Sequence, residues 1–84
     1  TKAAALNLAP MGIRVNSVHP GVIATPMIMQ EDAKAAIEEF AKHIPLKRVS
    51  QPEEVSQLVV FLASDESSYS TGAEFVVDGG ITAQ

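Results

Sequence analysis

The fold class follows from one nine-residue stretch, Ile13-Arg14-Val15-Asn16-Ser17-Val18-His19-Pro20-Gly21. Over residues 13–18 apolar and polar side chains largely alternate, and three of the six are β-branched aliphatics. This pattern predicts a β-strand, because alternate side chains of a strand point to opposite faces of a sheet. We expect the strand to end after residue 18, at His19-Pro20-Gly21, since Pro20 has no amide proton and Gly21 permits a sharp turn. A second strand is predicted over residues 73–77, closed by Asp78-Gly79-Gly80.

Three segments have the composition and spacing of helices. Residues 1–8 are rich in Ala and Leu and lead to Pro10 and Gly12, which end the helix. Residues 31–43 open with two acids and carry a narrow apolar stripe, formed by Ala33, Ile37, Phe40, Ala41 and Ile44. Residues 52–63 begin with proline and two acids and continue as an almost entirely apolar helix, which needs cover on more than one side. One short helical turn is expected within residues 64–72.

The predicted order is therefore helix, strand, helix, helix, strand. Two strands joined through helices run parallel in an α/β sheet, with a right-handed crossover. Parallel sheets are covered on both faces and normally contain more than two strands. We therefore expect an α/β fold in which residues 1–84 supply one piece of a doubly wound parallel sheet.

The composition excludes several classes of function. The 84 residues contain no cysteine, which excludes a disulfide scaffold and a thiol nucleophile within them and favours a reducing, cytoplasmic location. The net charge of −4 argues against nucleic-acid binding, and no apolar run is long enough for a membrane span. His19 and His43 have no neighbouring ligand residues, so no metal site is expected. No helix cap precedes residues 1–8, and we expect that helix to start upstream of Thr1.

Several motifs together span nearly the whole chain. They are Gly12 to Gly21 followed by Thr25-Pro26-Met27, Pro52-Glu53-Glu54-Val55, Val60-Phe61-Leu62-Ala63-Ser64-Asp65, Tyr69-Ser70-Thr71-Gly72 and Val77-Asp78-Gly79-Gly80. In this order they resemble the carboxyl-terminal third of short-chain dehydrogenases/reductases. Residues 16–21 and 64–80 look most similar to bacterial hydroxysteroid dehydrogenases and related ketone or alcohol reductases.

The resemblance implies a Rossmann-like sheet that binds NAD or NADP. It also implies hydride transfer between the nicotinamide and a secondary alcohol or ketone, steroid-like or otherwise hydrophobic. Members of that family carry a glycine-rich phosphate loop and a Ser, Tyr, Lys catalytic set, none of which lies within residues 1–84. Lys2 lies too close to Gly12 to be that lysine and is expected on the helix surface. We therefore expect residues 1–84 to be the carboxyl-terminal segment of a single NAD(P)-binding domain, with no catalytic residue and no activity by themselves.

The resemblance also implies a cofactor site directly after the first strand. In that family the positions that match Pro20, Gly21, Ile23 and Thr25 line the nicotinamide end of the cofactor. Ile23 would bind through its backbone, and the Thr25 hydroxyl would reach the carboxamide or a phosphate. The position agrees with the rule that α/β folds bind ligands at the carboxyl ends of strands. The alternative is a turn that only ends the strand.

A substrate lid is expected at about residues 26–50. Its apolar side chains would line a hydrophobic pocket and exclude water, and they are Met27, Ile28, Met29, Ile37 and Phe40. Ordinary packing of a peripheral helix explains the same residues, so both interpretations stay open.

Two functions remain open at this point. The first is an oxidoreductase that takes a small-molecule alcohol or ketone and forms a homo-oligomer, a dimer or tetramer, through the helix Val55–Ala63 and the strand Phe75–Val77. The second is a non-catalytic oligomerisation or interaction module derived from the same family. The apolar helix motivates the second, because a large exposed apolar patch favours assembly. Neither function involves nucleic acid or a membrane.

Overall fold

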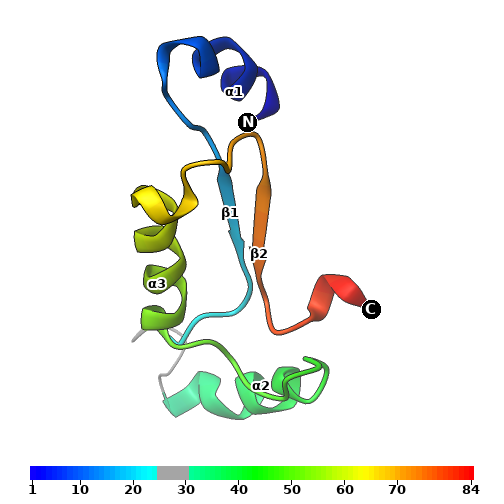
Figure 1. The fold of residues 1–84 in the computed structure, drawn as a ribbon. Helices are drawn as coiled ribbons and strands as arrows, with labels where there is room; N and C mark the ends of the chain where they lie inside the picture. Colours follow the sequence, from blue (N-terminus) through cyan, green and yellow to red (C-terminus); the bar gives the residue numbers. More distant parts are fainter. Residues whose placement is uncertain (25–30) are drawn as a thin grey trace.

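The computed structural model describes residues 1–24 and 31–84, which form an α/β arrangement (Figure 1). In chain order the elements are α1 (Lys2–Leu8), η1 (Ala9–Met11), β1 (Ser17–Pro20), α2 (Glu31–Ala41), α3 (Pro52–Ala63), η2 (Asp65–Ser67), β2 (Glu74–Val77) and η3 (Ile81–Ala83), where η denotes a short 3-10 turn. The predicted order of helix, strand, helix, helix, strand is confirmed. The turn η2 lies within the predicted residues, and η3 is an addition that the sequence did not predict.

The two strands form a parallel pair, as predicted, with Ser17 opposite Glu74. Figure 1 shows α3 beside this pair, and Val18 of β1 and Leu62 of α3 line a shared groove. On the opposite face of the sheet the side chain of Val76 is 51% exposed. Within the described residues, a helix therefore covers one face of the sheet, and the other face is open near β2.

The first strand begins later than the sequence predicted. The alternation predicted a strand over residues 13–18, but β1 begins at Ser17. The Asn16 side chain donates to the Ser70 carbonyl oxygen at 2.9 Å and accepts from the Ala73 amide at 3.1 Å. Side-chain hydrogen bonds thus replace ladder pairing before Ser17, which shortens the strand at this end.

The same strand also ends later, at Pro20, although proline was expected to stop it at residue 18. The amides of Ser17 and Gly21 donate to the carbonyl oxygens of Ala73 and Val77 at 3.0 and 2.8 Å. Because backbone groups alternate sides along a strand, the nitrogen of Pro20 lies on the edge that faces away from β2. Proline removes no hydrogen bond from this ladder, so the strand includes it.

The helix boundaries agree better with the sequence. After α1 and η1 the chain turns at Gly12, which adopts the left-handed conformation (φ 76°) as expected for a residue past a helix end. The helix α2 ends at Ala41, two residues before the predicted His43, whose amide instead bonds the Phe40 oxygen in a tighter turn. The predicted bounds of α3, residues 52–63, are confirmed.

The guanidinium of Arg14 joins three segments that lie far apart in the sequence. It donates to the carbonyl oxygens of Leu62 and Ser64 at 2.9 and 3.2 Å, at the end of α3. It also donates to the Ser67 hydroxyl at 3.0 Å and to the Ser70 carbonyl oxygen at 3.2 Å. The carbonyl groups at the end of a helix, here those of Leu62 and Ser64, lack hydrogen-bond partners within the helix. A cation placed there also interacts favourably with the negative end of the helix dipole. Arg14 thus attaches the end of α3 and the loop behind it to the start of β1.

At its other end α3 is attached to the preceding connector by an exposed ion pair. Arg48 donates to both carboxylate oxygens of Glu54, at 2.8 and 2.9 Å, and the same carboxylate accepts from the Gln51 amide at 2.8 Å. The hydrogen bond from Arg48, followed by the one from Gln51, lowers the pKa of Glu54 from 4.5 to about 2. The sequence explained Glu54 by the helix dipole, and the structure adds this pair with Arg48.

Few of the described side chains are fully buried. Ala5, Ile44 and Ser67 are each 2% exposed, whereas Val60 of α3 is 68% exposed, and Val59, which lines the groove shared with Val18, is still 48% exposed. The apolar helix that the sequence expected to need cover on several sides is therefore covered on one side by the described chain. None of the helices that the structure describes has the length and apolar character to cross a bilayer.

Replacing Arg14 by Met should lower the free energy of unfolding by about 2 kcal/mol or more, because half-buried carbonyls lose a charged donor. Arg14→Lys should recover part of that loss, since an ammonium group cannot present the same fork of donors. Thermal or urea unfolding measures the difference. Equal stability of the Met variant and the unchanged protein would contradict the role given to Arg14.

The Arg48–Glu54 pair should make stability depend on pH in the acid range. The folded-state pKa of Glu54 is depressed, so its contribution is present above pH 4.5 and is lost as the pH falls towards 2. Arg48→Gln removes the main cause of the lowered pKa of Glu54. The free energy of unfolding of this variant should therefore fall less between pH 4.5 and pH 2 than that of the unchanged protein. Urea midpoints at about pH 5 and pH 3 test this. Glu53→Gln is the matched control, and its urea midpoint should fall between these two pH values by as much as that of the unchanged protein.

Candidate functional site

The residues that the sequence assigned to a cofactor site lie where β1 ends. Pro20 closes the strand, Gly21 lies beside the carboxyl end of β2, and Ile23 lies beside Ser50 in the connector before α3. Figure 1 shows the chain after β1 turning towards the start of α3. Pro20 is exposed, and Gly21 and Ile23 are half-buried. Thr25, the fourth predicted residue, lies outside the described residues. The structure therefore brings three of the four together at the edge where parallel sheets bind ligands.

Gly21 has a packing reason to be glycine. A Cβ atom at this position would lie 2.9 Å from the Asp78 Cα and 3.0 Å from the Asp78 Cβ. Contacts this short do not occur without displacement of the backbone of Asp78. The two strand ends can thus approach this closely only because residue 21 carries no side chain.

The segment after Gly21 is fixed by a second backbone contact. The Ala24 amide donates to the Ser50 oxygen at 2.7 Å, and the Ser50 amide donates to the Val22 oxygen at 2.9 Å. Together these form an isolated parallel bridge between Ile23 and Ser50. The loop is thereby held between β2 on one side and the connector before α3 on the other.

This bridge determines what the backbone of Ile23 can bind. Val22 and Ala24 direct their bonding groups to Ser50, so the N–H and C=O of Ile23 point to the opposite side. Among the described residues neither group has a hydrogen-bond partner. One donor and one acceptor therefore lie side by side on a fixed loop. A primary carboxamide, which carries both an acceptor oxygen and an NH₂ donor, complements this pair.

The carboxylate of Asp78 organises the chain after β2. One oxygen accepts from the Gly80 amide at 2.9 Å, and the other accepts from the Thr82 amide at 3.0 Å and the Thr82 hydroxyl at 2.7 Å. These hydrogen bonds, the hydroxyl of Thr82 first, lower the pKa of Asp78. Asp78 is therefore an ionised cap on η3 that adjoins Gly21.

Two hollows adjoin this end of the sheet. A cavity of about 80 Å³ lies between Val22, Leu46 and Val77, with room for a few water molecules at most. A more open hollow of about 480 Å³ borders Pro20 and Gly21 on the uncovered face of the sheet. Only the second has the size of a small-molecule site.

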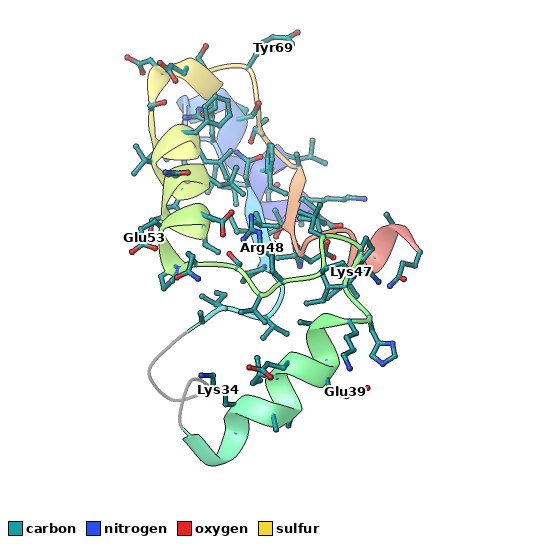
Figure 2. All side chains as sticks on the ribbon, turned by 90° about the horizontal axis from the view of Figure 1, so that it is seen from below. Lys34, Glu39, Lys47, Arg48, Glu53 and Tyr69 are labelled. Carbon is teal, nitrogen blue, oxygen red and sulfur yellow. The ribbon has the colours of Figure 1, made fainter. Side chains whose placement is uncertain are left out.

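The helix α2 lies at the same end of the molecule, beyond the carboxyl ends of the strands (Figure 1), and carries Lys34 and Glu39 (Figure 2). Of the predicted lid residues, Ile37 is half-buried and Phe40 is 44% exposed. Along the predicted apolar stripe, Phe40 is therefore exposed, while Ile44 is almost fully buried. The lid residues Met27, Ile28 and Met29 lie outside the described residues.

One further side chain borders this site. His19 lines the open hollow beside Pro20 and Gly21, and its ring nitrogen Nε2 lies 2.9 Å from the Ser17 hydroxyl. Other chemically notable groups do not join the site. Tyr69 is fully exposed next to η2, at the opposite end of the sheet, where Lys2 also lies, beside Gly72 (Figure 2). The described residues contain no group of three or more side chains suited to hold a metal ion.

Sequence reasoning missed the contacts that Ser50 and Asp78 make with the loop after β1. The only local indication was Asp78-Gly79-Gly80, because consecutive glycines suggest positive φ angles, and both adopt them (67° and 100°). Nothing in the sequence near Ser50 predicted its bridge to Ile23.

Comparisons with known proteins agree with this geometry. A family model described as enoyl-(acyl carrier protein) reductase matches residues 1–82. A protein of Mycobacterium bovis named 3-alpha-(or 20-beta)-hydroxysteroid dehydrogenase is 58% identical over 83 residues, covering 99% of this chain and 30% of its own length. The cyclopentanol dehydrogenase of Comamonas sp. is 58% identical over 84 residues, covering 99% of this chain and 34% of its own.

The chain thus spans about a third of the length of the relatives it matches. Among solved structures, a short chain dehydrogenase family protein from Francisella tularensis superimposes with a TM-score of 0.90 at 41% identity, over 100% of this chain and 39% of that one. The α/β fold class expected from the sequence is therefore confirmed. With a family model over nearly all its residues and a closely superimposing member, the chain belongs to the short-chain dehydrogenase/reductase family.

Proposed function

We propose that residues 1–84 are the carboxyl-terminal segment of an NAD(P)-binding domain in an oxidoreductase. The enzyme transfers a hydride between a nicotinamide cofactor, NAD or NADP, and a secondary alcohol or ketone. In this proposal the loop 20–24 binds the nicotinamide end, and α2 belongs to a substrate lid over about residues 26–50. The names of relatives that act on hydroxysteroids and cyclic alcohols support this substrate class.

The observation that carries the proposal is the backbone of Ile23. Its N–H and C=O lie together on a loop that two backbone contacts hold in place, on the side away from Ser50. A nicotinamide carboxamide placed there exchanges two hydrogen bonds with them, which fixes the ring face presented for hydride transfer. Since loop and strand are already ordered, little conformational entropy is lost on binding.

The proton that accompanies hydride transfer needs a donor outside these residues. A general acid must lie within hydrogen-bond reach of the substrate oxygen. Lys2 lies beside Gly72, just before β2 begins, and Tyr69 lies at this same end of the sheet, opposite the end where α2 lies (Figure 2). We therefore assign substrate and cofactor positioning to these residues and acid–base chemistry to another segment of the enzyme.

We further propose that the enzyme is a cytoplasmic homo-oligomer, a dimer or tetramer, assembled through α3 and β2. The helix α3 exposes the apolar residues Val59, Val60 and Phe61, and Val76 of β2 is exposed as well. Covering such a surface is favourable in proportion to its apolar area. The alternative function, a non-catalytic assembly module, rests on this same surface and dispenses with the loop 20–24.

A graft onto a full-length relative tests the proposed function. Residues 1–84 replace the matching third of the Comamonas cyclopentanol dehydrogenase, which is 58% identical over this length. The chimera should reduce NAD or NADP with a cyclic secondary alcohol, at a kcat/KM within about tenfold of the parent, since the catalytic part is unchanged. The isolated 84 residues should show no turnover.

The parent enzyme truncated at the graft junction is the matched control and should be inactive. A chimera that folds and assembles like the parent but transfers no hydride would contradict the proposal and favour the assembly module. Turnover by the isolated 84 residues would contradict the assignment of the chemistry to another segment.

A further inference from the structure

We propose that Asp78 and Thr82 are positioning residues that set the place of α2 relative to the loop 20–24. The segment 78–84, here called the tail, would do this by holding the turn at residues 42–47 that follows α2. The inference deepens the proposed function and rests on it, because it takes α2 as part of the substrate lid.

The tail is folded back on itself by one carboxylate. Asp78 accepts three hydrogen bonds, from the Gly80 amide, the Thr82 amide and the Thr82 hydroxyl, the last at 2.7 Å. Hydrogen bonds to an ionised acceptor are about twice as strong as those between neutral groups. Asp78 and Thr82 thus determine where Gly79 and Gly80, which lie between them, can contact the rest of the chain.

The two glycines contact the turn after α2 more closely than any other residue type allows. A Cβ atom on Gly79 would lie 2.7 Å from the Ile44 side chain, and one on Gly80 would lie 3.0 Å from Pro45. Ile44 is 2% exposed and is the largest fully buried side chain among the described residues. The turn is therefore packed tightly against the tail.

Hydrogen bonds join the same two segments. The Leu46 amide donates to the Gly79 oxygen at 3.1 Å, and the Gln84 side chain donates to the His43 oxygen at 3.4 Å. Lys47, whose φ of 61° lies in the left-handed region, closes the turn by donating from its ammonium group to the Lys42 oxygen at 2.7 Å. A left-handed lysine is unfavourable by itself, so the surrounding contacts must hold it.

Asp78 also adjoins the proposed cofactor loop. A side chain on Gly21 would collide with the Cα and Cβ atoms of Asp78, so Asp78 can lie against the loop only because residue 21 is glycine. One residue therefore contacts the loop 20–24 through its backbone and controls the turn after α2 through its carboxylate. Thr82 also lines the open hollow beside Gly21, so the exchange of residues 42–47, and not the KM alone, must report its effect on the turn after α2.

The test uses three variants in the full-length chimera described above. Thr82→Val keeps the shape of the side chain and removes the hydroxyl donor, while Thr82→Ser retains the donor. Thr71→Val is the matched control, since it removes a threonine hydroxyl that accepts from the Val15 amide at 3.1 Å, at the other end of the sheet. Hydrogen exchange of residues 42–47, above all of the Leu46 amide, reports the contact without any need for activity.

In Thr82→Val, exchange at residues 42–47 should become about tenfold faster and the KM for the alcohol should rise several-fold, with a smaller effect on kcat. Thr82→Ser and Thr71→Val should leave both quantities near those of the unmodified chimera. Unchanged exchange in Thr82→Val, or an equal effect in Thr71→Val, would overturn the contact. Faster exchange with an unchanged KM would overturn the positioning role. A chimera with no hydride transfer at all would contradict the proposed function, whereas the exchange data would still test the link between the tail and the turn.

Discussion

The guanidinium of Arg14 is the interaction on which the arrangement of the described chain depends. Its partners, Leu62, Ser64, Ser67 and Ser70, all lie about fifty positions after Arg14 in the sequence. Arg14 precedes β1, and its side chain bonds both the end of α3 and the loop that leads into β2. This attachment fixes the carboxyl end of α3 against the sheet, while the amino-terminal end of the helix points towards the carboxyl ends of the strands (Figure 1). Because the connector before α3 carries Ser50, the position of the loop 20–24 depends on the same anchor at the opposite end of the sheet.

The carboxyl ends of the strands are organised by a different constraint, which is space. Gly21, Gly79 and Gly80 each lie where a side chain would collide with a neighbouring segment. Three segments can therefore meet at one edge: the loop after β1, the tail after β2 and the turn after α2. Few side chains are buried by these contacts, and the outer side of α3 remains exposed. Polar contacts and close backbone approach at this edge, more than a large core, fix the position of the helix α2 relative to the proposed cofactor loop.

The sequence predicted those features of the fold that depend on interactions between residues close together in the chain. The bounds of α3 followed from a proline and two acids at its start, and Gly12 and the parallel pair were predicted equally well. The bounds of β1 were wrong at both ends, because Asn16 bonds residues more than fifty positions away and the nitrogen of Pro20 lies on the edge that faces away from β2. Pro20, Gly21 and Ile23 could be assigned from the rule for strand ends and from the family resemblance. The roles of Ser50, Asp78 and Thr82 could not, since each depends on distances between segments that only the folded chain brings together.

The proposed cofactor site depends most directly on the backbone of Ile23 as the partner of the nicotinamide carboxamide. Nuclear magnetic resonance of the chimera labelled with ¹⁵N-isoleucine and ¹⁵N-serine tests this, with NADH or NADPH added to saturation. When the cofactor binds, the Ile23 amide should shift and exchange more slowly with solvent. The Ser50 amide, already bonded to Val22, should change little. An Ile23 amide that stays unchanged in a chimera that binds the cofactor and transfers hydride would contradict this role of Ile23.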